Sequence, residues 1–277
     1  MAVKGVNGVA LITGAAGGIG REAAFAFAEA GANGIIFADM NDNGAREAAE
    51  QSKTVAIQSA YRYLVVHLDV TDPASVQSMV DAAIKEFGRI DYSVNCAGVG
   101  TDSNAPTADA SVEEFDKLAE INTRGTMLCV RAVSKAMAVQ EPLMYRGRHG
   151  QRSLGRGSII NITSVMSFIG ARGKLPYAAS KHAVMGITKT AALDNTAHHI
   201  RVNAICPAWV DTAMMAADFD KQPELKGIIQ AVSPVGRMAV PEEVGDVIVF
   251  LSSASASYIN GQGLIVDAGL SLTMNRM

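Results

Sequence analysis

Short apolar runs rich in Val and Ile alternate along the chain with longer segments in which apolar residues recur at helical spacing. Seven such runs are predicted to be strands: Val9–Thr13, Gly34–Asp39, Tyr63–Asp69, Tyr92–Asn95, Ser158–Thr163, Arg201–Ile205 and Leu264–Val266. The runs are continuous rather than alternating, which is typical of strands covered by helices on both faces. The alternation of strands and helices predicts βαβ units around a parallel sheet.

Polar side chains and prolines mark the starts of several predicted helices, because they satisfy or replace free backbone N–H groups. The starts lie at Thr71-Asp72-Pro73, at Ser111 with Glu114 spaced as a capping box, and at Pro241-Glu242-Glu243. The last of these helices is expected to end near Leu251, and the helix that begins at Tyr177 is expected to end near His199.

Two segments interrupt the alternation. Residues 141–157 contain four arginines and several glycines, which predicts an exposed loop insertion. Residues 213–236 carry Met214, Met215 and Phe219 ahead of the last helix, so they belong either to the core or to a substrate lid over the strand ends. Because the chain has no repeat, low-complexity tract or linker, the pattern predicts one α/β domain over residues 1–277, with a doubly wound parallel sheet of about seven strands.

Composition narrows the classes of function. Hydrophobic residues make up 49% of the chain, and the net charge of -3 argues against a nucleic-acid binder. The three cysteines and five histidines show no CxxC, HExxH or similar spacing, so neither a metal nor a disulfide framework is expected. No apolar run approaches the roughly 18 residues of a membrane helix. These observations predict a cytoplasmic protein without a membrane partner.

A glycine-rich segment, Thr13-Gly14-Ala15-Ala16-Gly17-Gly18-Ile19-Gly20, lies between the first strand and the first helix. Glycines allow a tight turn in which the backbone approaches a pyrophosphate, and the start of a helix supplies free N–H groups. A P-loop is excluded because Arg21, and no Lys, follows the last glycine. The candidate cofactor-binding residues here are Gly14, Gly18, Ile19 and Gly20.

Asp39 ends the second strand, and Met40 follows it. A carboxylate at this position can accept hydrogen bonds from both adenosine ribose hydroxyls and repels a 2′-phosphate, which favours NAD over NADP. The alternative is that Asp39 only caps the helix that begins near Asn43.

Two further strand ends carry candidate cofactor residues, Asp69-Val70 at the end of the third strand and Asn95-Cys96-Ala97-Gly98 at the end of the fourth. In an open α/β sheet, ligands bind outside the carboxyl ends of the strands. Small side chains at Ala97 and Gly98 would let a flat cofactor pass close to the backbone. Each segment alone is equally compatible with an ordinary turn.

Tyr177 and Lys181 are four residues apart near the start of a helix, so their side chains share one face. Ser164 follows the fifth strand, 13 residues before Tyr177. A tyrosine is a poor base at neutral pH, and lowering its pKa to about 7 requires roughly 4 kcal/mol. A lysine ammonium and a cationic nicotinamide ring could supply this by stabilising the phenolate.

From Val9 to Gly269 the chain resembles the short-chain dehydrogenase/reductase family, and the motifs occur in family order. The matching motifs are TGxxxGIG at Thr13–Gly20, NNAG as Asn95-Cys96-Ala97-Gly98, the helix asparagine Asn122, and Ser164 with the YxxxK pair Tyr177 and Lys181. The insertion at residues 141–157 is similar to insertions in some fungal members of secondary metabolism.

The resemblance implies a catalytic set of Asn122, Ser164, Tyr177 and Lys181. Tyr177 would be the general acid/base, Ser164 would stabilise the substrate oxygen, and Lys181 would hold the nicotinamide ribose and lower the tyrosine pKa. Asn122 would anchor a water that links Lys181 to solvent.

The resemblance also implies nicotinamide contacts from Pro207, Val210 and Thr212, in a segment that matches the family pattern PGxxxT, and adenine contacts from Asp69 and Val70. Two positions depart from the pattern. Ala208 replaces the family glycine, and Cys96, expected to be a packing residue rather than a reactive thiol, replaces the second asparagine of NNAG.

These observations predict hydride transfer between NAD(H) and a secondary alcohol or ketone. Met166, Trp209 and Met214, with Ser164 and Tyr177, are the expected substrate contacts, and such a lining favours an apolar or cyclic substrate. Phe168, Met215 and Phe219 lie in the same segments. The alternatives are an NADP-dependent ketoreductase, a non-redox member acting as an isomerase, cyclase or dehydratase, and a dinucleotide-sensing protein without turnover.

Charged residues make up only 18% of the chain, below the roughly 25% of average soluble proteins. Family members commonly associate through the helices that correspond to Val112–Gln140 and Tyr177–His199. A homotetramer, or at least a homodimer, is therefore expected, with Ala183, Val184, Ile187 and Ala191 near the contact.

Overall fold

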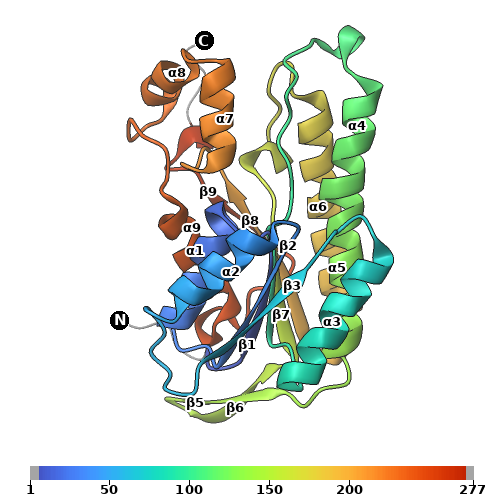
Figure 1. Ribbon diagram of the computed structural model, residues 1–277, viewed down its shortest axis with the longest axis vertical. Helices are drawn as coiled ribbons and strands as arrows, with labels where there is room; N and C mark the ends of the chain where they lie inside the picture. The colour runs from blue at the N-terminus through green and yellow to red at the C-terminus, as the bar shows by residue number, and fades with distance from the viewer. Residues whose placement is uncertain (1–5, 273–277) are drawn as a thin grey trace.

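The predicted apolar runs form one parallel sheet in the computed structural model, which describes residues 6–272 (Figure 1). The strands of this sheet are β1 (Val9–Thr13), β2 (Gly34–Asp39), β3 (Arg62–His67), β4 (Tyr92–Asn95), β7 (Gly157–Ile162), β8 (Ile200–Pro207) and β9 (Gly263–Val266). Their spatial order is β3-β2-β1-β4-β7-β8-β9, and every neighbouring pair is parallel. The predicted doubly wound sheet of seven strands is thus confirmed.

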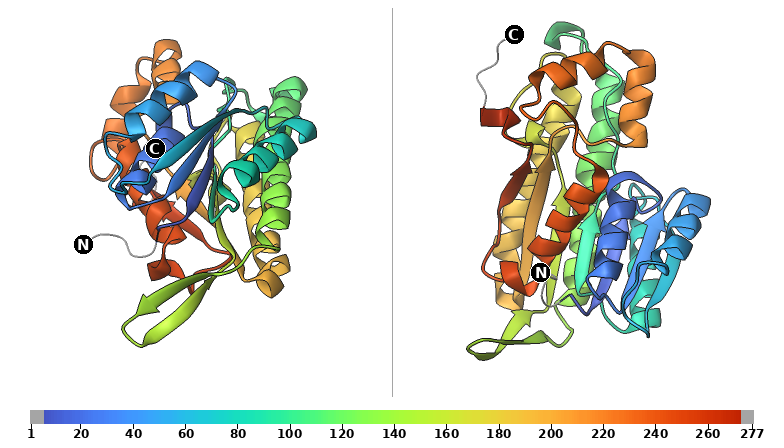
Figure 2. Two further views of the ribbon diagram at one scale, coloured as in Figure 1. Left: turned by 60° about the horizontal axis from the view of Figure 1, so that its bottom comes forward. Right: turned by 90° about the vertical axis from the view of Figure 1, so that its left-hand side faces the viewer.

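Helices cover both faces of the sheet (Figures 1 and 2). They are α1 (Gly18–Glu29), α2 (Asp42–Ser52), α3 (Pro73–Phe87), α4 (Val112–Leu118), α5 (Thr126–Met137), α6 (Leu175–Asp194), α7 (Ala213–Lys221), α8 (Leu225–Val232) and α9 (Pro241–Ser252). Alternate residues of β1 pack against the helices on opposite faces of the sheet, because successive side chains of a strand point to opposite faces. Ala10 and Ile12 join the core under α1, α2 and α9, whereas Val9 and Leu11 join the core under α3, α5 and α6.

The strand order reverses between β1 and β4, because the chain builds outward through β2 and β3 before it returns to the other side of β1. A crevice forms at such a point, outside the carboxyl ends of the two strands. The glycine turn follows β1 and the Asn95–Gly98 segment follows β4. Both therefore border the crevice.

Most predicted helix starts are confirmed. Asp72 caps α3 by accepting hydrogen bonds from Ala74 N at 3.0 Å and Ser75 N at 3.2 Å. Ser111 caps α4 through Glu114 N at 3.0 Å, but the second half of the predicted capping box is wrong. The Glu114 carboxylate turns instead to the loop that follows β4, where it accepts from Asp102 N at 2.7 Å.

The end of α6 also differs from the prediction. The helix ends at Asp194 rather than near His199, and a short 3-10 turn, Thr196–His198, follows it. His199 has a φ of 54°, a left-handed conformation that cannot continue a helix. The chain then enters β8 at Ile200.

Residues 141–157 form a β-hairpin rather than the expected loop. Strand β5 (Leu143–Gly147) pairs antiparallel with β6 (Gly150–Gly155), at the end of the molecule opposite α7 and α8 (Figure 1). Gly150 has a φ of 103°, so glycine suits the tight turn between the strands. Arg152 attaches the hairpin to the body by donating to the Ser257 hydroxyl and to the Ala254 carbonyl.

The lid segment contains two helices, α7 and α8, with a buried Met215 and Ile229 on their inner sides. Thr212 caps α7, accepting from Met215 N at 3.5 Å. Across residues 6–272, none of the helices combines the length and hydropathy that crossing a bilayer requires.

Candidate active site

The glycine turn leaves the start of α1 open to a ligand. Gly17 precedes the helix with no side-chain cap, and the first turn contains no acidic residue. Gly14 and Gly18 have φ values of 68° and 52°, which favour glycine. A Cβ at Gly20 would lie 2.1 Å from the Gly14 carbonyl oxygen, so the turn closes only without a side chain there. This combination of free N–H groups and bare backbone fits a dinucleotide pyrophosphate.

Asp39 faces this turn from the end of β2. Its Oδ2 accepts from Ala16 N at 2.9 Å and its Oδ1 from Asn41 N at 2.9 Å. The alternative that Asp39 caps α2 is wrong, because Asn41 is the cap and accepts from Gly44 N at 3.1 Å. The carboxylate is therefore held beside the start of α1, while the neighbouring Met40 is 65% exposed.

The other candidate adenine residues take different orientations. Val70 is buried and packs on Gly125, where a Cβ would lie 2.8 Å from Val70 Cγ2. Asp69 turns its carboxylate to Thr71, accepting from its N–H at 2.9 Å and its hydroxyl at 2.7 Å. These hydrogen bonds hold the pKa of Asp69 below its usual range. The half-buried Ile19 packs against the core beneath α1.

Asn95 is buried, and its side chain belongs to the core. Its Nδ2 donates to Asn161 Oδ1 at 2.8 Å, and Asn161 Nδ2 donates to Thr188 Oγ1 at 2.9 Å. This chain of hydrogen bonds ties β4 to β7 and α6. A cofactor contact at Asn95 would therefore have to come from its backbone.

Small residues after β4 let three parts of the site meet. A Cβ at Gly14 would lie 2.8 Å from Ala97 N, so the glycine turn contacts this segment directly. A Cβ at Gly98 would lie 3.0 Å from Asn122 Oδ1 and 3.8 Å from Lys181 Nζ. The glycine turn, Asn122 and Lys181 thus lie along one continuous path.

Asn122 lies in a π-helical turn, Ala119–Gly125, between α4 and α5. π-Helical turns are rare and occur often at functional sites. Its Oδ1 accepts from Val99 N at 2.9 Å, and its Nδ2 donates to Val99 O at 3.0 Å and Ser180 Oγ at 3.2 Å. The side chain therefore joins the loop after β4 to the helix that carries Tyr177.

Ser164 and Tyr177 meet at the carboxyl end of β7. Ser164 precedes a short 3-10 turn, accepts from Met166 N at 3.2 Å, and hydrogen-bonds Tyr177. Lys181 Nζ lies 5.5 Å from the centre of the Tyr177 ring and donates to the Ile162 carbonyl at 3.2 Å. The three side chains predicted from the sequence are thus gathered in one place.

Burial dominates the electrostatics of this group. It raises the pKa of Tyr177 to about 12, opposed by the Ser164 hydrogen bond, and lowers the pKa of Lys181 to about 8. The expectation that Lys181 lowers the tyrosine pKa stays a prediction, because it concerns the site with the nicotinamide bound. An activated phenolate needs a further positive charge, which a bound nicotinamide cation would provide.

The segment after β8 closes the other side of the crevice. A Cβ at Gly18 would lie 3.4 Å from Thr212 Cγ2, so Thr212 lies against the glycine turn. Val210 is buried and bridges to Ala239, and the buried Pro207 accepts a long hydrogen bond of 3.5 Å from Ser164 Oγ. Ala208 donates its N–H to the Val266 carbonyl at 3.1 Å.

The expected substrate contacts are only partly exposed. Met166 and Trp209 are half-buried, and Met214 is 46% exposed on α7. Met215 is buried beneath α7, and Phe168 packs toward β9, where a Cβ at Gly263 would lie 2.9 Å from its ring. Sequence reasoning missed two charged residues beside this lining, Lys174 and Asp218. The position of Lys174, three residues before Tyr177, was the available signal.

Cys96 and Cys206 lie near Lys181, and burial raises the pKa of their thiols to about 12 and about 11. Both remain neutral at physiological pH, which fits packing rather than reactivity. Within residues 6–272, no group of His, Cys, Asp and Glu side chains could hold a metal ion.

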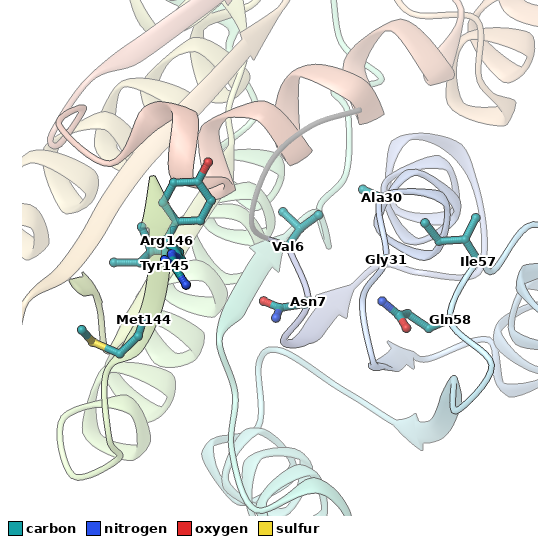
Figure 3. Close-up of a pocket in the computed structure, with 10 residues that line it drawn as sticks. Val6, Asn7, Ala30, Gly31, Ile57, Gln58, Met144, Tyr145 and Arg146 are labelled. Carbon is teal, nitrogen blue, oxygen red and sulfur yellow. The ribbon is translucent and has the colours of Figure 1, made fainter. Parts of the chain in front are cut away.

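A cavity of about 360 Å³ lies at the other end of the sheet (Figure 3). Its lining comes from the segments that precede β1 and β3, from the end of α1 and from the hairpin: Val6, Asn7, Ala30, Gly31, Ile57, Gln58, Met144, Tyr145, Arg146 and Leu154. Because Tyr177 and the glycine turn lie at the carboxyl ends of the strands, this cavity is not part of the candidate active site.

Residues 14–271 match the family model described as "Enoyl-(Acyl carrier protein) reductase". A short-chain dehydrogenase of Penicillium roqueforti, anuF, is 44% identical over 96% of this chain and 97% of its own. A short-chain dehydrogenase of Aspergillus ruber, fogB, is 43% identical over 97% of this chain and 98% of its own. Among solved structures, levodione reductase superposes with a TM-score of 0.84 at 31% identity, over 98% of this chain and 100% of its own. The chain therefore belongs to the short-chain dehydrogenase/reductase family of oxidoreductases, as its motifs predicted.

Proposed function

We propose that the protein transfers hydride between NAD(H) and a secondary alcohol or ketone, with Tyr177 as the general acid/base. The observation that supports this most is the meeting of Ser164, Tyr177 and Lys181 beside an uncapped helix start. The bare backbone at Gly14, Gly18 and Gly20 suits a dinucleotide. When bound, the nicotinamide ring would accept or supply the hydride.

Each side chain has a definite task in this proposal. Ser164 hydrogen-bonds the reacting oxygen, and Tyr177 takes the proton from the alcohol or returns it to the ketone oxygen. Lys181 is buried and holds the ribose while its ammonium favours the phenolate. Asn122 fixes the loop after β4 against α6. It would also anchor a water that links Lys181 to solvent.

NAD is the cofactor that Asp39 supports. Its carboxylate is oriented by Ala16 N and Asn41 N, and it would accept from the ribose hydroxyls while repelling a 2′-phosphate. Pro207, Val210 and Thr212 would border the nicotinamide, and Val70 the adenine.

A cyclic or apolar substrate agrees with the lining of Met166, Trp209 and Met214. Two relatives from Sinomonas cyclohexanicum, 34% and 37% identical, are named as cis- and trans-4-hydroxycyclohexanecarboxylate dehydrogenases, and levodione reductase is a structural neighbour. These names support cyclic alcohols and ketones as the first substrates to test. The fungal relatives support a role in secondary metabolism.

The experiment is turnover of a panel of cyclic alcohols and ketones, followed by the nicotinamide absorbance, in the wild type and in Tyr177→Phe. The variant should lose activity by about 100-fold or more, which is typical of losing a general acid/base. Cofactor affinity should be unchanged. Tyr258→Phe is the matched control, because Tyr258 is fully exposed.

Full activity in Tyr177→Phe would remove Tyr177 from the mechanism. Consumption of substrate without any change in nicotinamide absorbance would favour an isomerase, cyclase or dehydratase instead. A preference for NADP of more than about tenfold would contradict the role given to Asp39.

A further inference from the structure

Helix α7 packs against the loop that follows β4. Three residues of α7 lie on the helix face that contacts this loop. Met214, Asp218 and Lys221 are spaced four and three residues apart, so they form one stripe along the helix. A Cβ at Gly100 would lie 3.3 Å from Met214 Sδ, and Lys221 forms an ion pair with Asp102. Because Asp218 lies between these two contacts, its carboxylate faces the same loop.

Lys174 approaches this place from the start of α6. It is the residue before the helix and precedes Tyr177 by three positions. Its Nζ donates to the Ser103 carbonyl at 3.2 Å. The backbone of Lys174 therefore lies one turn before Tyr177, and its ammonium reaches the loop that follows β4.

The loop beneath Lys174 is held in a single shape. Glu114 Oε1 accepts from Thr101 Oγ1 at 2.7 Å, from Asp102 N at 2.7 Å and from Ser103 N at 3.2 Å. A Cβ at Gly173 would lie 2.5 Å from the Asn104 carbonyl oxygen, so the chain before α6 is pressed against the same loop. The loop that Lys174 contacts is therefore fixed by the Glu114 hydrogen bonds and by its packing against the chain before α6.

Among the described residues, Lys174 and Asp218 form no salt bridge. In the described part of the chain, neither has an oppositely charged group within 4.0 Å, and the Asp218 carboxylate accepts no hydrogen bond. Asp102 is paired with Lys221, and Glu114 is occupied by the loop. Burial lowers the pKa of Lys174, opposed by the fields of Asp218, Glu114 and Asp102. Burial also raises the pKa of Tyr177, and Asp218 adds a smaller contribution of the same sign. Lys174 Nζ reaches the Ser103 carbonyl, and Asp218 lies one turn of α7 before Lys221, which pairs with the adjacent Asp102. The two opposite charges therefore border the same loop.

We propose that Lys174 and Asp218 together recognise a second hydroxyl group on the substrate, away from the oxygen that reacts at Tyr177. A hydroxyl can accept from the ammonium and donate to the carboxylate at the same time. A carboxylate in this position would be attracted by Lys174 but repelled by Asp218. An apolar group would leave both charges desolvated. The inference rests on the proposed function and refines it: the preferred substrates are hydroxylated cyclic ketones and diols.

The test compares 3- and 4-hydroxycyclohexanone with 4-methylcyclohexanone, which is similar in size but lacks the second hydroxyl. The wild type should prefer a hydroxylated ketone by about tenfold or more in kcat/KM, because hydrogen bonds to charged groups are worth at least that factor. Lys174→Met and Asp218→Asn should each lose this preference through a higher KM for the hydroxylated ketones, while the KM for 4-methylcyclohexanone stays unchanged. Lys226→Met, an exposed lysine on α8, is the control and should change neither.

Three results would overturn the proposal. The wild type could show no preference for a second hydroxyl, or the preference could survive in both variants. In the third result, 4-oxocyclohexanecarboxylate would be a better substrate than the hydroxylated ketones, and its kcat/KM would rise further in Asp218→Asn. Lys174 would then be an anion site on its own.

If no ketone is reduced at all, the proposed hydride transfer fails, and a binding measurement still decides this inference. Trp209 is the sole tryptophan of the chain and lies in the segment after β8, so its fluorescence reports binding of cyclohexane-1,4-diol. Weaker binding to Lys174→Met than to wild type supports the hydroxyl site. Equal binding, or none to either protein, contradicts it.

Discussion

Replacing Lys181 with Met is expected to stabilise the fold while it abolishes turnover. Lys181 is 7% exposed, and its Nζ has a single protein hydrogen bond, to the Ile162 carbonyl at 3.2 Å, among the described residues. Burial lowers its pKa from an ordinary value of 10.5 to about 8, which means that the folded chain resists the charge. The Lys181 ammonium that the proposed mechanism needs therefore lowers the stability of the fold.

The magnitude follows from the two pKa values. At about 1.4 kcal/mol per pKa unit, a charged Lys181 costs the folded state about 3 kcal/mol near neutral pH. Between about pH 8 and 10.5 the unfolded chain binds more protons than the folded chain, so this contribution to stability rises with pH and the cost disappears above 10.5. Met leaves the Ile162 carbonyl without a donor, which costs about 1 kcal/mol. The net gain at neutral pH is about 2 kcal/mol.

Urea unfolding of the wild type and of Lys181→Met, near pH 7 and near pH 10, measures the difference in their free energies of unfolding. The variant should be the more stable protein at the lower pH, and its advantage should vanish at the higher one. Lys189→Met, on the exposed side of the same helix, should show no such pH-dependent gain. A variant that is less stable at neutral pH, or a gain that stays constant with pH, would refute the reasoning.

Three further outcomes are expected. Asp39→Ser should shift the ratio of kcat/KM for NADP over NAD upward by about tenfold or more, measured with one substrate and both cofactors; an unchanged ratio would remove Asp39 from cofactor selection. Gly20→Ala should lose folding or nucleotide binding, measured by thermal unfolding and calorimetry, because its Cβ would lie 2.1 Å from the Gly14 carbonyl oxygen; Gly17→Ala, with nothing within 4 Å, should be tolerated. Leu193→Asp should convert a homotetramer or homodimer to a 29.0 kDa monomer in light scattering, since Leu193 is 75% exposed on α6; a monomeric wild type would contradict subunit association.

The expected subunit contact needs one adjustment on α6. Val184 is buried within its own chain, and Ile187 and Ala191 are half-buried against the core. The exposed positions of the helix are Leu175, Ala179, His182, Gly186, Lys189, Thr190, Leu193 and Asp194. Subunit association itself stays a prediction, and its contact on this helix is expected at these outward positions, with Ala183 half-buried beside them.

Local patterns were enough for the strands and for most helix starts. A buried strand must be apolar throughout, as in Val9–Thr13, and a cap such as Asp72 acts on N–H groups two and three residues away. The hairpin was missed because its arginines and glycines suggested solvent exposure. Its attachment depends on Arg152 reaching Ser257 and Ala254, more than 100 residues away.

For the site, the sequence by itself determined the glycine turn, Asp39 and the spacing of Tyr177 and Lys181, because each depends on neighbours within one strand, turn or helix. Only the tertiary structure decided that the Asn95 side chain lies in the core, that burial raises the pKa of Tyr177, and that Lys174 reaches the Ser103 carbonyl. These features arise where distant segments pack together. The dielectric and the hydrogen-bond partners of a buried group depend on that packing, which no local pattern specifies.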